Sequence, residues 1–325
     1  MLLLAAGLLL VGFAILIKGA DFLVNGASSM AKKFGISNIA IGLTVVSFGT
    51  SAPELIVSLL SAINGNSDAS FGNVIGSNNF NLLGILGIAG LIYPLVVQRN
   101  TVKFEVPISL LAAGVLYMLV NDSWLRGATS NELSRTDSFI LLVFFGFFMA
   151  YIYRTMKKAS DYSDEAIIKL YSTPVSIGLS VLGLVMLVGG GKLVVDNAVK
   201  LAEHFGLSQK LIGLTILAVG TSLPELATSA VAAYRKNTDI AIGNVVGSNI
   251  FNIFFILGIT GTISPIGYNT AMNFDLKVLG VATVVLMIFM FTLNTRKLDR
   301  WEALLLFLGY IVYTVFLIGM EEGLA

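Results

Sequence analysis

The chain has 325 residues, of which 56% are hydrophobic and 12% are charged; its mean hydropathy is +0.88 and its formal net charge is +1. This composition excludes an ordinary soluble domain and predicts a polytopic membrane protein. A chain without cysteine has no disulfides or thiolate metal sites, a single histidine disfavours zinc and copper, and no basic cluster suggests a nucleic-acid partner. Any metal ion that this chain handles has to be bound by oxygen atoms.

Ten hydrophobic runs are long enough to cross the bilayer core of about 30 Å, which takes about 20 helical residues. The first run lacks a positively charged start and has an internal counterpart, so we treat it as a permanent helix rather than a cleaved signal peptide. The sequence therefore predicts an all-α fold of ten transmembrane helices. In chain order the runs are 2–30, 38–62, 69–93, 104–120, 137–156, 174–203, 209–234, 239–263, 273–294 and 301–320.

The ten runs form two sets of five, a first repeat over 1–156 and a second repeat over 174–325, joined by a polar loop over 157–173. Seven residues beginning at Gly49 (GTSAPEL) return 171 residues later as GTSLPEL, and ten beginning at Gly72 (GNVIGSNNFN) return as GNVVGSNIFN. With an odd number of spans per repeat, the second copy has to enter the membrane from the opposite side. The sequence thus predicts inverted repeats whose shared interface lies at mid-depth.

The distribution of Lys and Arg predicts the orientation. Thirteen of these residues fall in loops on one side and five on the other, while Lys18 and Lys192 lie inside spans. Because cytoplasmic loops carry the positive excess, the 157–173 loop is expected in the cytoplasm, and both termini outside the cell membrane. Within the spans we expect Lys18 to pair with Asp21 and Lys192 with Asp196 on the helix surface, with a gating role as the alternative.

Each copy of the seven-residue motif, here called the heptad, places a proline and a glutamate near the expected membrane centre, where burying a charge costs several kcal/mol. Pro53 and Pro224 lack an N–H and break the helix, which frees carbonyl oxygens near 47–50 and 218–221. The residues expected to share one helical face are Thr50, Ser51 and Glu54 in the first copy and Thr221, Ser222 and Glu225 in the second. We interpret the two heptads as halves of one cation site; a kink with a structural ion pair is the alternative.

The Gly-Asn-Val stretches contribute a second layer of oxygen atoms. Ser77 with Asn81, and Ser248 with Asn252, are spaced i, i+4 and share a helical face. Their Gly-x-x-x-Gly steps allow close helix approach, although packing alone would explain these glycines. A Ca²⁺ ion takes about six to eight oxygen ligands, and two glutamates would neutralise it. Na⁺ is similar in size and also prefers oxygen, so competition for one site gives a physical basis for antiport.

These paired motifs resemble the α-repeats of the calcium:cation antiporter superfamily, and most closely its Na⁺/Ca²⁺ exchanger branch, over essentially the whole chain. The resemblance implies Ca²⁺ efflux coupled to Na⁺ entry by alternating access, with the first and sixth spans as a gating pair. We expect a single chain in the lipid bilayer, without a cofactor. The cation ligands that the resemblance implies are Thr50, Ser51, Glu54, Ser77, Asn81, Thr221, Ser222, Glu225, Ser248 and Asn252, with the carbonyls of Ser47 and Ala218.

One position departs from part of the superfamily. Some exchangers carry aspartate where this chain has Asn252, so the site here holds at most two formal negative charges. Three Na⁺ ions would leave one positive charge unbalanced, and both glutamates can titrate, so coupling to H⁺ or K⁺ stays an alternative. A passive cation channel is a more remote alternative. An enzyme is disfavoured because no nucleophile–base pair or metal-activating histidine cluster is present.

Overall fold

A computed structural model describes residues 2–125, 127, 130–155, 169–205, 218–292 and 296–321. The described chain is mostly helical. Eight of its helices are long and apolar enough to cross a membrane, and a bent helix pair raises the number to nine. The seventh expected span begins at 209, and its first residues, 209–217, lie outside the described part of the chain. The total of ten spans therefore stays a prediction.

The elements of the first predicted repeat follow the expected runs closely. They are α1 (Leu2–Phe34), α2 (Asn38–Ile41), η1 (Gly42–Val46), α3 (Ser47–Thr50), α4 (Ala52–Ile63), α5 (Ser67–Asn79), η2 (Phe80–Ile85), α6 (Leu86–Ile92), β1 (Leu95–Val96), η3 (Thr101–Glu105), α7 (Val106–Val120), α8 (Asp122–Leu125), β2 (Glu132–Leu133) and α9 (Arg135–Thr155). Elements η1, η2 and η3 are π-helical, a form that occurs mostly as short insertions in α-helices.

The second predicted repeat presents its described elements in the same order. They are α10 (Thr173–His204), α12 (Ala218–Gly220), α13 (Leu223–Tyr234), α14 (Thr238–Ile250), the π-helical η5 (Phe251–Leu257), α15 (Gly258–Ile263), β3 (Ile266–Gly267), η6 (Thr270–Met272), α16 (Asn273–Phe289), β4 (Lys297–Leu298) and α17 (Arg300–Glu321). Helices α5 and α14 both have 13 residues, both start after an asparagine cap and both continue into a π-helical turn.

The prolines break the helices where the sequence predicts. Residues Asn38–Thr50 and Ala52–Ile63 form a bent pair with an angle of 47°. Ser51 stands at the break with non-helical dihedral angles (φ −82°, ψ 7°), and Pro53 falls in the first turn of α4. Proline is tolerated there because the N–H groups of a first helical turn have no intrahelical partner. Ser222 precedes α13 with nearly the same angles (φ −89°, ψ 8°).

Two short antiparallel strand pairs amend the all-α expectation. Strand β1 pairs with β4, with Leu95 opposite Leu298, and β2 pairs with β3, with Leu133 opposite Ile266. Each pair joins a strand from the first predicted repeat to one from the second. Helices of one repeat likewise pack against helices of the other, since α17 packs on α6, α9 on α15 and α7 on α16. The two repeats are therefore interleaved rather than folded as separate domains.

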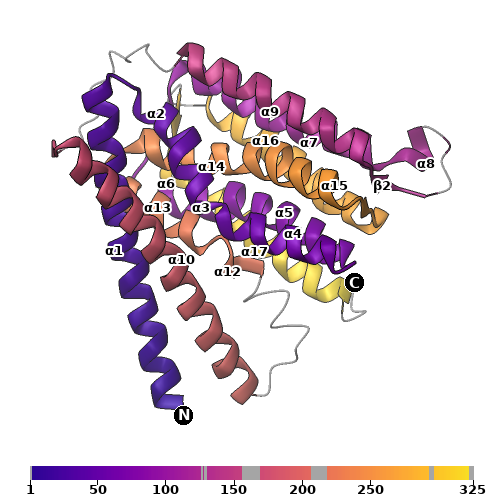
Figure 1. Ribbon diagram of the computed structural model, residues 1–325, viewed down its shortest axis with the longest axis horizontal. Coiled ribbons are helices and arrows are strands. Elements are labelled where there is room, and N and C mark those ends of the chain that lie inside the picture. Colours follow the sequence, from indigo (N-terminus) through magenta and orange to yellow (C-terminus); the bar gives the residue numbers. More distant parts are fainter. Residues whose placement is uncertain are drawn as a thin grey trace.

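Helices α1 and α10 lie side by side and extend beyond the other helices (Figure 1). They run antiparallel, because Gly12 meets Gly190 whereas Gly26 meets Ser176. A Cβ atom added at Gly19 would lie 2.9 Å from the carbonyl oxygen of Gly183, so the two backbones are in direct contact. Small residues permit this approach. The contacts between α1 and α10 therefore run along five of the glycines, which are Gly12, Gly19, Gly26, Gly183 and Gly190.

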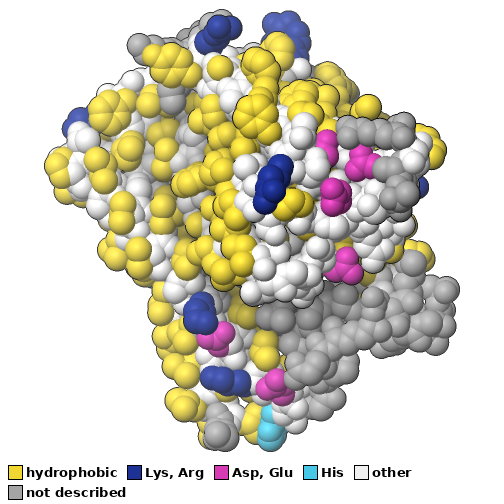
Figure 2. Space-filling model, turned by 45° about the vertical axis from the view of Figure 1, so that its right-hand side comes forward, with side chains coloured by type: hydrophobic (Ala, Val, Ile, Leu, Met, Phe, Trp, Pro, Cys, Tyr) yellow, Lys and Arg dark blue, Asp and Glu magenta, His cyan; other side chains and the backbone are white. Residues whose placement is uncertain are grey.

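Apolar side chains on the outside of the molecule are consistent with a surface that faces lipid. Figure 2 shows hydrophobic side chains over much of one face, with few charged side chains among them. The helices α1, α10 and α17 expose large hydrophobic residues such as Leu3, Val185 and Val312. Polar residues are instead concentrated inside, on the helices that meet at the centre.

The two expected surface ion pairs had different outcomes. Lys192 and Asp196 do pair on α10, with Nζ 3.3 Å from Oδ2, and both side chains are exposed. Asp21, however, pairs with Arg235 at the end of α13 instead of with Lys18. The i, i+3 spacing of Lys18 and Asp21 predicts a pair within one helix. The fold instead brings the end of α13, with Arg235, against α1.

Candidate cation-binding site

The two glutamates lie together at the centre of the helices, and each is held by the opposite heptad. The Ser222 hydroxyl donates to Glu54 Oε1 at 2.8 Å. The Ser51 hydroxyl donates to Glu225 Oε1, also at 2.8 Å. Both carboxylates are fully buried. The crossed hydrogen bonds fix the heptads against each other, so neither half makes the cluster alone.

The crossed arrangement adds a detail that the sequence did not predict. Ser51 was expected beside Glu54 at a site shared by the two halves, and its hydroxyl bonds to Glu225 of the other half. Ser222 behaves in the same way toward Glu54.

The serines of the second layer reach the same carboxylates. Ser77 Oγ lies 3.4 Å from Glu54 Oε1, and Ser248 Oγ lies 3.4 Å from Glu225 Oε1. The Ser222 hydroxyl is also 2.9 Å from that of Ser77, which links a heptad to a Gly-Asn-Val stretch. As predicted, both serines are placed beside the glutamate of the neighbouring span. All of these hydroxyls are buried.

The threonines of the heptads bind asparagines across the two halves. Thr50 Oγ1 donates to Asn244 Oδ1 at 3.0 Å, and Thr221 Oγ1 donates to Asn73 Oδ1 at 3.2 Å. Sequence reasoning did not select these two asparagines, although they stand directly after Gly72 and Gly243 in the repeated stretches. Their repetition was the signal that could have identified them.

The amide groups of these asparagines hold the backbone that carries each glutamate. Asn73 Nδ2 donates to the carbonyl of Glu54 at 3.1 Å, and Asn244 Nδ2 donates to that of Glu225 at 3.2 Å. Each amide also donates to a serine one turn further along, at 2.8 and 2.9 Å respectively. With donors and acceptors both satisfied, Asn73 and Asn244 act as supports that orient the glutamates.

Four asparagines close the cluster where α5 continues into η2 and α14 continues into η5. Asn81 Nδ2 donates to Asn249 Oδ1 at 3.0 Å, and Asn252 Nδ2 donates to Asn78 Oδ1 at 2.9 Å. Asn78 and Asn249 in turn each donate to the backbone carbonyl of the other at 3.3 Å. Asn81 and Asn252 were predicted as ligands, whereas Asn78 and Asn249 were missed. The amide groups of the predicted ligands are thereby fixed in direction.

The fixed directions leave four buried oxygen atoms without a hydrogen-bond donor. They are Glu54 Oε2, Glu225 Oε2, Asn81 Oδ1 and Asn252 Oδ1. A buried polar atom left unsatisfied costs about 1–3 kcal/mol, and more when it carries charge. Two carboxylate and two amide oxygens are the ligand type that Ca²⁺ and Na⁺ accept, and hydroxyl oxygens surround them. The residues present therefore fit a hard cation.

The two carbonyls expected as further ligands have different surroundings. The Ser47 carbonyl accepts the Ser51 N–H at 3.0 Å and the Thr50 hydroxyl at 3.3 Å. In the second half the Ser222 N–H donates instead to the Val219 carbonyl at 3.1 Å, one residue beyond Ala218, which belongs to α12. The two breaks thus differ in detail, and the ligand roles of Ser47 and Ala218 stay predictions.

Several buried carboxylates lie outside this cluster, and Glu105 is one of them. Glu105 ends the π-helical turn η3, is 3% exposed, and accepts a hydrogen bond from Tyr151 Oη at 2.6 Å. Its Oε2 has no donor. Sequence reasoning passed over Glu105, although an ionisable residue inside the expected span 104–120 was a signal of its own.

Helix α10 covers both heptads. A side chain added at Gly49 would overlap Leu184, and one added at Gly220 would overlap Val195. A Cβ added at Gly191 would lie 3.8 Å from Pro224 Cδ, an ordinary van der Waals contact. Helix α1 packs on α13 beside them. The paired helices α1 and α10 therefore form one wall of the site.

Comparisons with known proteins match almost the whole chain. The profile of the family described as sodium/calcium exchanger protein matches residues 4–154 and 175–319. The putative antiporter CaxA of Alkalimonas amylolytica is 37% identical over 323 residues, which cover 96% of this chain and 98% of the relative. The sodium/calcium exchanger MaX1 of Methanosarcina acetivorans is 32% identical, covering 95% and 97%. A structure of the sodium-calcium exchanger NCX_Mj superposes with a TM-score of 0.81 at 31% identity, covering 97% and 99%.

Proposed function

Since the chain belongs to the sodium/calcium exchanger family, we propose that it is a secondary-active antiporter that exchanges Ca²⁺ for Na⁺ at the central site. The observation that carries this proposal is the group of four buried oxygen atoms without donors, two from Glu54 and Glu225 and two from Asn81 and Asn252. A Ca²⁺ ion would satisfy all four and would be neutralised by the two carboxylates.

The surrounding groups act as positioning elements for these ligands. Ser222 and Ser51 hold one oxygen of each glutamate, and the other oxygen is buried without a hydrogen-bond donor. Asn73 and Asn244 hold the backbone of the glutamates from behind. An ion that enters such a prearranged cluster requires little reorganisation of the protein. Because Na⁺ and Ca²⁺ use the same oxygens, we infer that they compete for one site.

Alternating access requires that one wall of this buried site can move. We propose that α1 and α10 are that wall, because they cover the heptads and contact each other more extensively than they contact any other helix. Their antiparallel packing also supports inverted repeats, since Leu3 to Phe34 and Pro174 to Phe205 hold corresponding places, 171 residues apart, in the two predicted repeats. In this proposal the full protein has ten spans, the 157–173 loop in the cytoplasm and both termini outside the cell membrane.

The test is ⁴⁵Ca²⁺ uptake by purified protein in sealed proteoliposomes, with outward gradients of Na⁺, K⁺, Li⁺ or H⁺ imposed one at a time. The expected result is Ca²⁺ accumulation above its equilibrium distribution with the Na⁺ gradient alone. Protein-free vesicles measure the leak. The Na⁺ proposal fails if the Na⁺ gradient drives no accumulation.

Proton coupling is the second candidate, and a specific observation favours keeping it. The site holds two carboxylates and neutral asparagines at positions 81 and 252, so two protons would balance one Ca²⁺ without excess charge. Accumulation driven by the H⁺ gradient but not by Na⁺ would replace the first proposal with this one, and accumulation driven by K⁺ would indicate a potassium-coupled exchanger. Flux that never exceeds equilibrium with any gradient would indicate a passive channel.

A further inference from the structure

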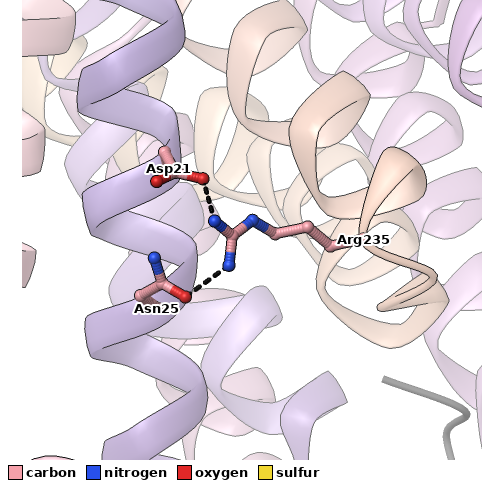
Figure 3. Close-up of polar contacts among 3 residues, drawn as sticks. All are labelled: Asp21, Asn25 and Arg235. Carbon is pink, nitrogen blue, oxygen red and sulfur yellow. Dashed lines mark hydrogen bonds and ion pairs between the residues drawn. The ribbon is translucent and has the colours of Figure 1, made fainter. Parts of the chain in front are cut away.

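An arginine at the end of α13 bridges to two residues of α1 (Figure 3). Arg235 Nη2 forms an ion pair with Asp21, and Arg235 Nη1 donates to Asn25 Oδ1, one turn further along α1. Two residues on, Asn237 Nδ2 donates to Ser28 Oγ at 2.9 Å. The turn between α13 and α14 is therefore tied to one face of α1 by three polar contacts.

In the described part of the chain, the corresponding turn of the first repeat shows no such ties. It joins α4 to α5 through Asn64, Gly65 and Asn66, which stand 171 residues before Arg235, Lys236 and Asn237. The Asn66 side chain only caps its own helix, at Ala69 N–H. Among the residues that the structure describes, no ion pair or side-chain hydrogen bond joins this turn to α10. The wall of the site is thus fastened to the core at one turn but not at the equivalent one.

The backbone of the tied turn points to a specific requirement for its side chains. Lys236 adopts φ 61°, a left-handed conformation that is unfavourable for residues other than glycine. Its counterpart Gly65 adopts φ 75° without that penalty. The Lys236 ammonium lies 5.6 Å from the centre of the Tyr93 ring at the end of α6. A left-handed conformation that persists at Lys236 indicates that the contacts around this turn hold the backbone in it.

We propose that Arg235 is a positioning residue that latches the α1–α10 wall to the α13–α14 turn and so keeps the central site closed toward the membrane face on which that turn lies. The proposal rests on the alternating access set out above. Helix α13 carries Glu225 in its first turn and ends directly before Arg235, so one helix connects the site to the latch. Opening the site toward this face separates α1 from the end of α13 and breaks both Arg235 contacts.

The exposure of the latch suits a contact that breaks in every transport cycle. The Arg235 and Asp21 side chains are 35% and 27% exposed, so water reaches them when they part. A fully buried pair would leave an uncompensated charge on opening, whereas a partly exposed pair adds only a modest bias. Since the described residues form no equivalent latch between the α4–α5 turn and α10, the bias acts in one direction only.

The test exploits the chain's lack of cysteine, which makes a single introduced thiol the only target for a thiol reagent. Gly191→Cys places that thiol on α10 beside Pro224, where a Cβ atom fits. A membrane-impermeant methanethiosulfonate is added to either face of vesicles with uniform orientation. We expect Arg235→Ala to raise the labelling rate from the face of the α13–α14 turn about fivefold and to lower it from the other face.

Three further variants separate a latch from general damage to the fold. Asp21→Asn removes the charge without changing the shape and is expected to have the same effect as Arg235→Ala. The exchange of charges in Asp21→Arg with Arg235→Asp is expected to restore the original rates. Asp196→Asn is the matched control, because it breaks an ion pair on the other wall helix that does not reach the core.

A second measurement is needed in case the thiol introduced by Gly191→Cys reacts too slowly for its labelling rate to be compared. The Ca²⁺ concentrations that half-saturate uptake are compared in right-side-out and inside-out vesicles, and their ratio is expected to shift about fivefold in Arg235→Ala and Asp21→Asn only. If neither rate nor ratio shifts, or if the charge exchange restores nothing, Arg235 is a structural anchor and the latch is wrong. Labelling does not depend on which ion is carried, so this outcome is independent of the proposed exchange reaction.

Discussion

The centre of the molecule and its α1–α10 wall are built in opposite ways. In the central spans, 78% of the apolar window of Ser67–Ile92 and 94% of that of Thr238–Ile263 are buried, yet these spans carry serine, asparagine and glycine. In the wall, 22% of the apolar window of Leu2–Phe34 and 33% of that of Thr173–His204 are buried, and the sequence there is strongly apolar. The centre thus buries a polar cluster within an apolar core, whereas the wall exposes mainly apolar side chains.

The difference indicates what each region can do. Hydrogen bonds are directional, so the bonds from Ser51 and Ser222 fix the positions of the carboxylate oxygens of Glu225 and Glu54. The wall is held together by glycine contacts between α1 and α10, whereas its polar contacts with the core, among the described residues, are those of Arg235 and Asn237 with α1. A rigid site beside a wall with few directional contacts is the arrangement that alternating access needs.

The largest effect on transport is expected when a charge is removed from the centre of the molecule rather than from its wall. Glu54→Gln or Glu225→Gln should reduce Ca²⁺ uptake by at least about 100-fold, because each substitution leaves half of the Ca²⁺ charge unbalanced in a fully buried site. Uptake is measured in proteoliposomes, and the elution profile in detergent reports folding. Glu105→Gln is the matched control, since it changes a buried carboxylate outside the cluster. Full uptake by either site variant would refute the assignment of the site.

A smaller effect is expected from the crossed serines. Ser51→Ala and Ser222→Ala each remove a hydrogen bond to a buried carboxylate, a contact that contributes about 1.5–3 kcal/mol. Each should raise the half-saturating Ca²⁺ concentration about tenfold, and by similar factors because the two bonds have equal lengths. Ser180→Ala, which loses a bond within α10 only, is the control. A strong effect in one serine and none in the other would show that the halves are not equivalent in use.

The smallest effect is expected at the glycine contacts of the wall. A Cβ atom at Gly183 would lie 2.6 Å from the Leu23 nitrogen, so Gly183→Ala overpacks the contact between α1 and α10. Overpacking costs about 1–3 kcal/mol, which should lower Tm by about 5 °C in a thermal scan in detergent. At Gly178 on the same helix an added Cβ meets no neighbour, so Gly178→Ala should leave Tm unchanged or slightly raise it. Equal shifts for both would mean that the wall does not depend on this contact.

Much of the path of the helices was predictable because it depends on local properties. The expected runs 69–93 and 239–263 differ from the observed spans Ser67–Ile92 and Thr238–Ile263 by two residues at most. The break before Pro53 follows from the missing N–H and the ring clash, which act within one helical turn. The repeated heptads also indicated that Glu54 and Glu225 approach one another, since the free-energy cost of a charged side chain inside a membrane has to be offset by polar partners.

The sequence by itself determined that this is a membrane protein of the exchanger type, with two glutamates and their hydroxyl and amide neighbours at the centre. Only the tertiary structure decided that Ser51 serves Glu225 and Ser222 serves Glu54, that Asn73 and Asn244 support the glutamates, and that Arg235 reaches Asp21. The physical reason is the range of the interactions. Apolar length and proline geometry act along the chain, whereas a hydrogen bond between residues some 170 positions apart exists only after the helices have packed.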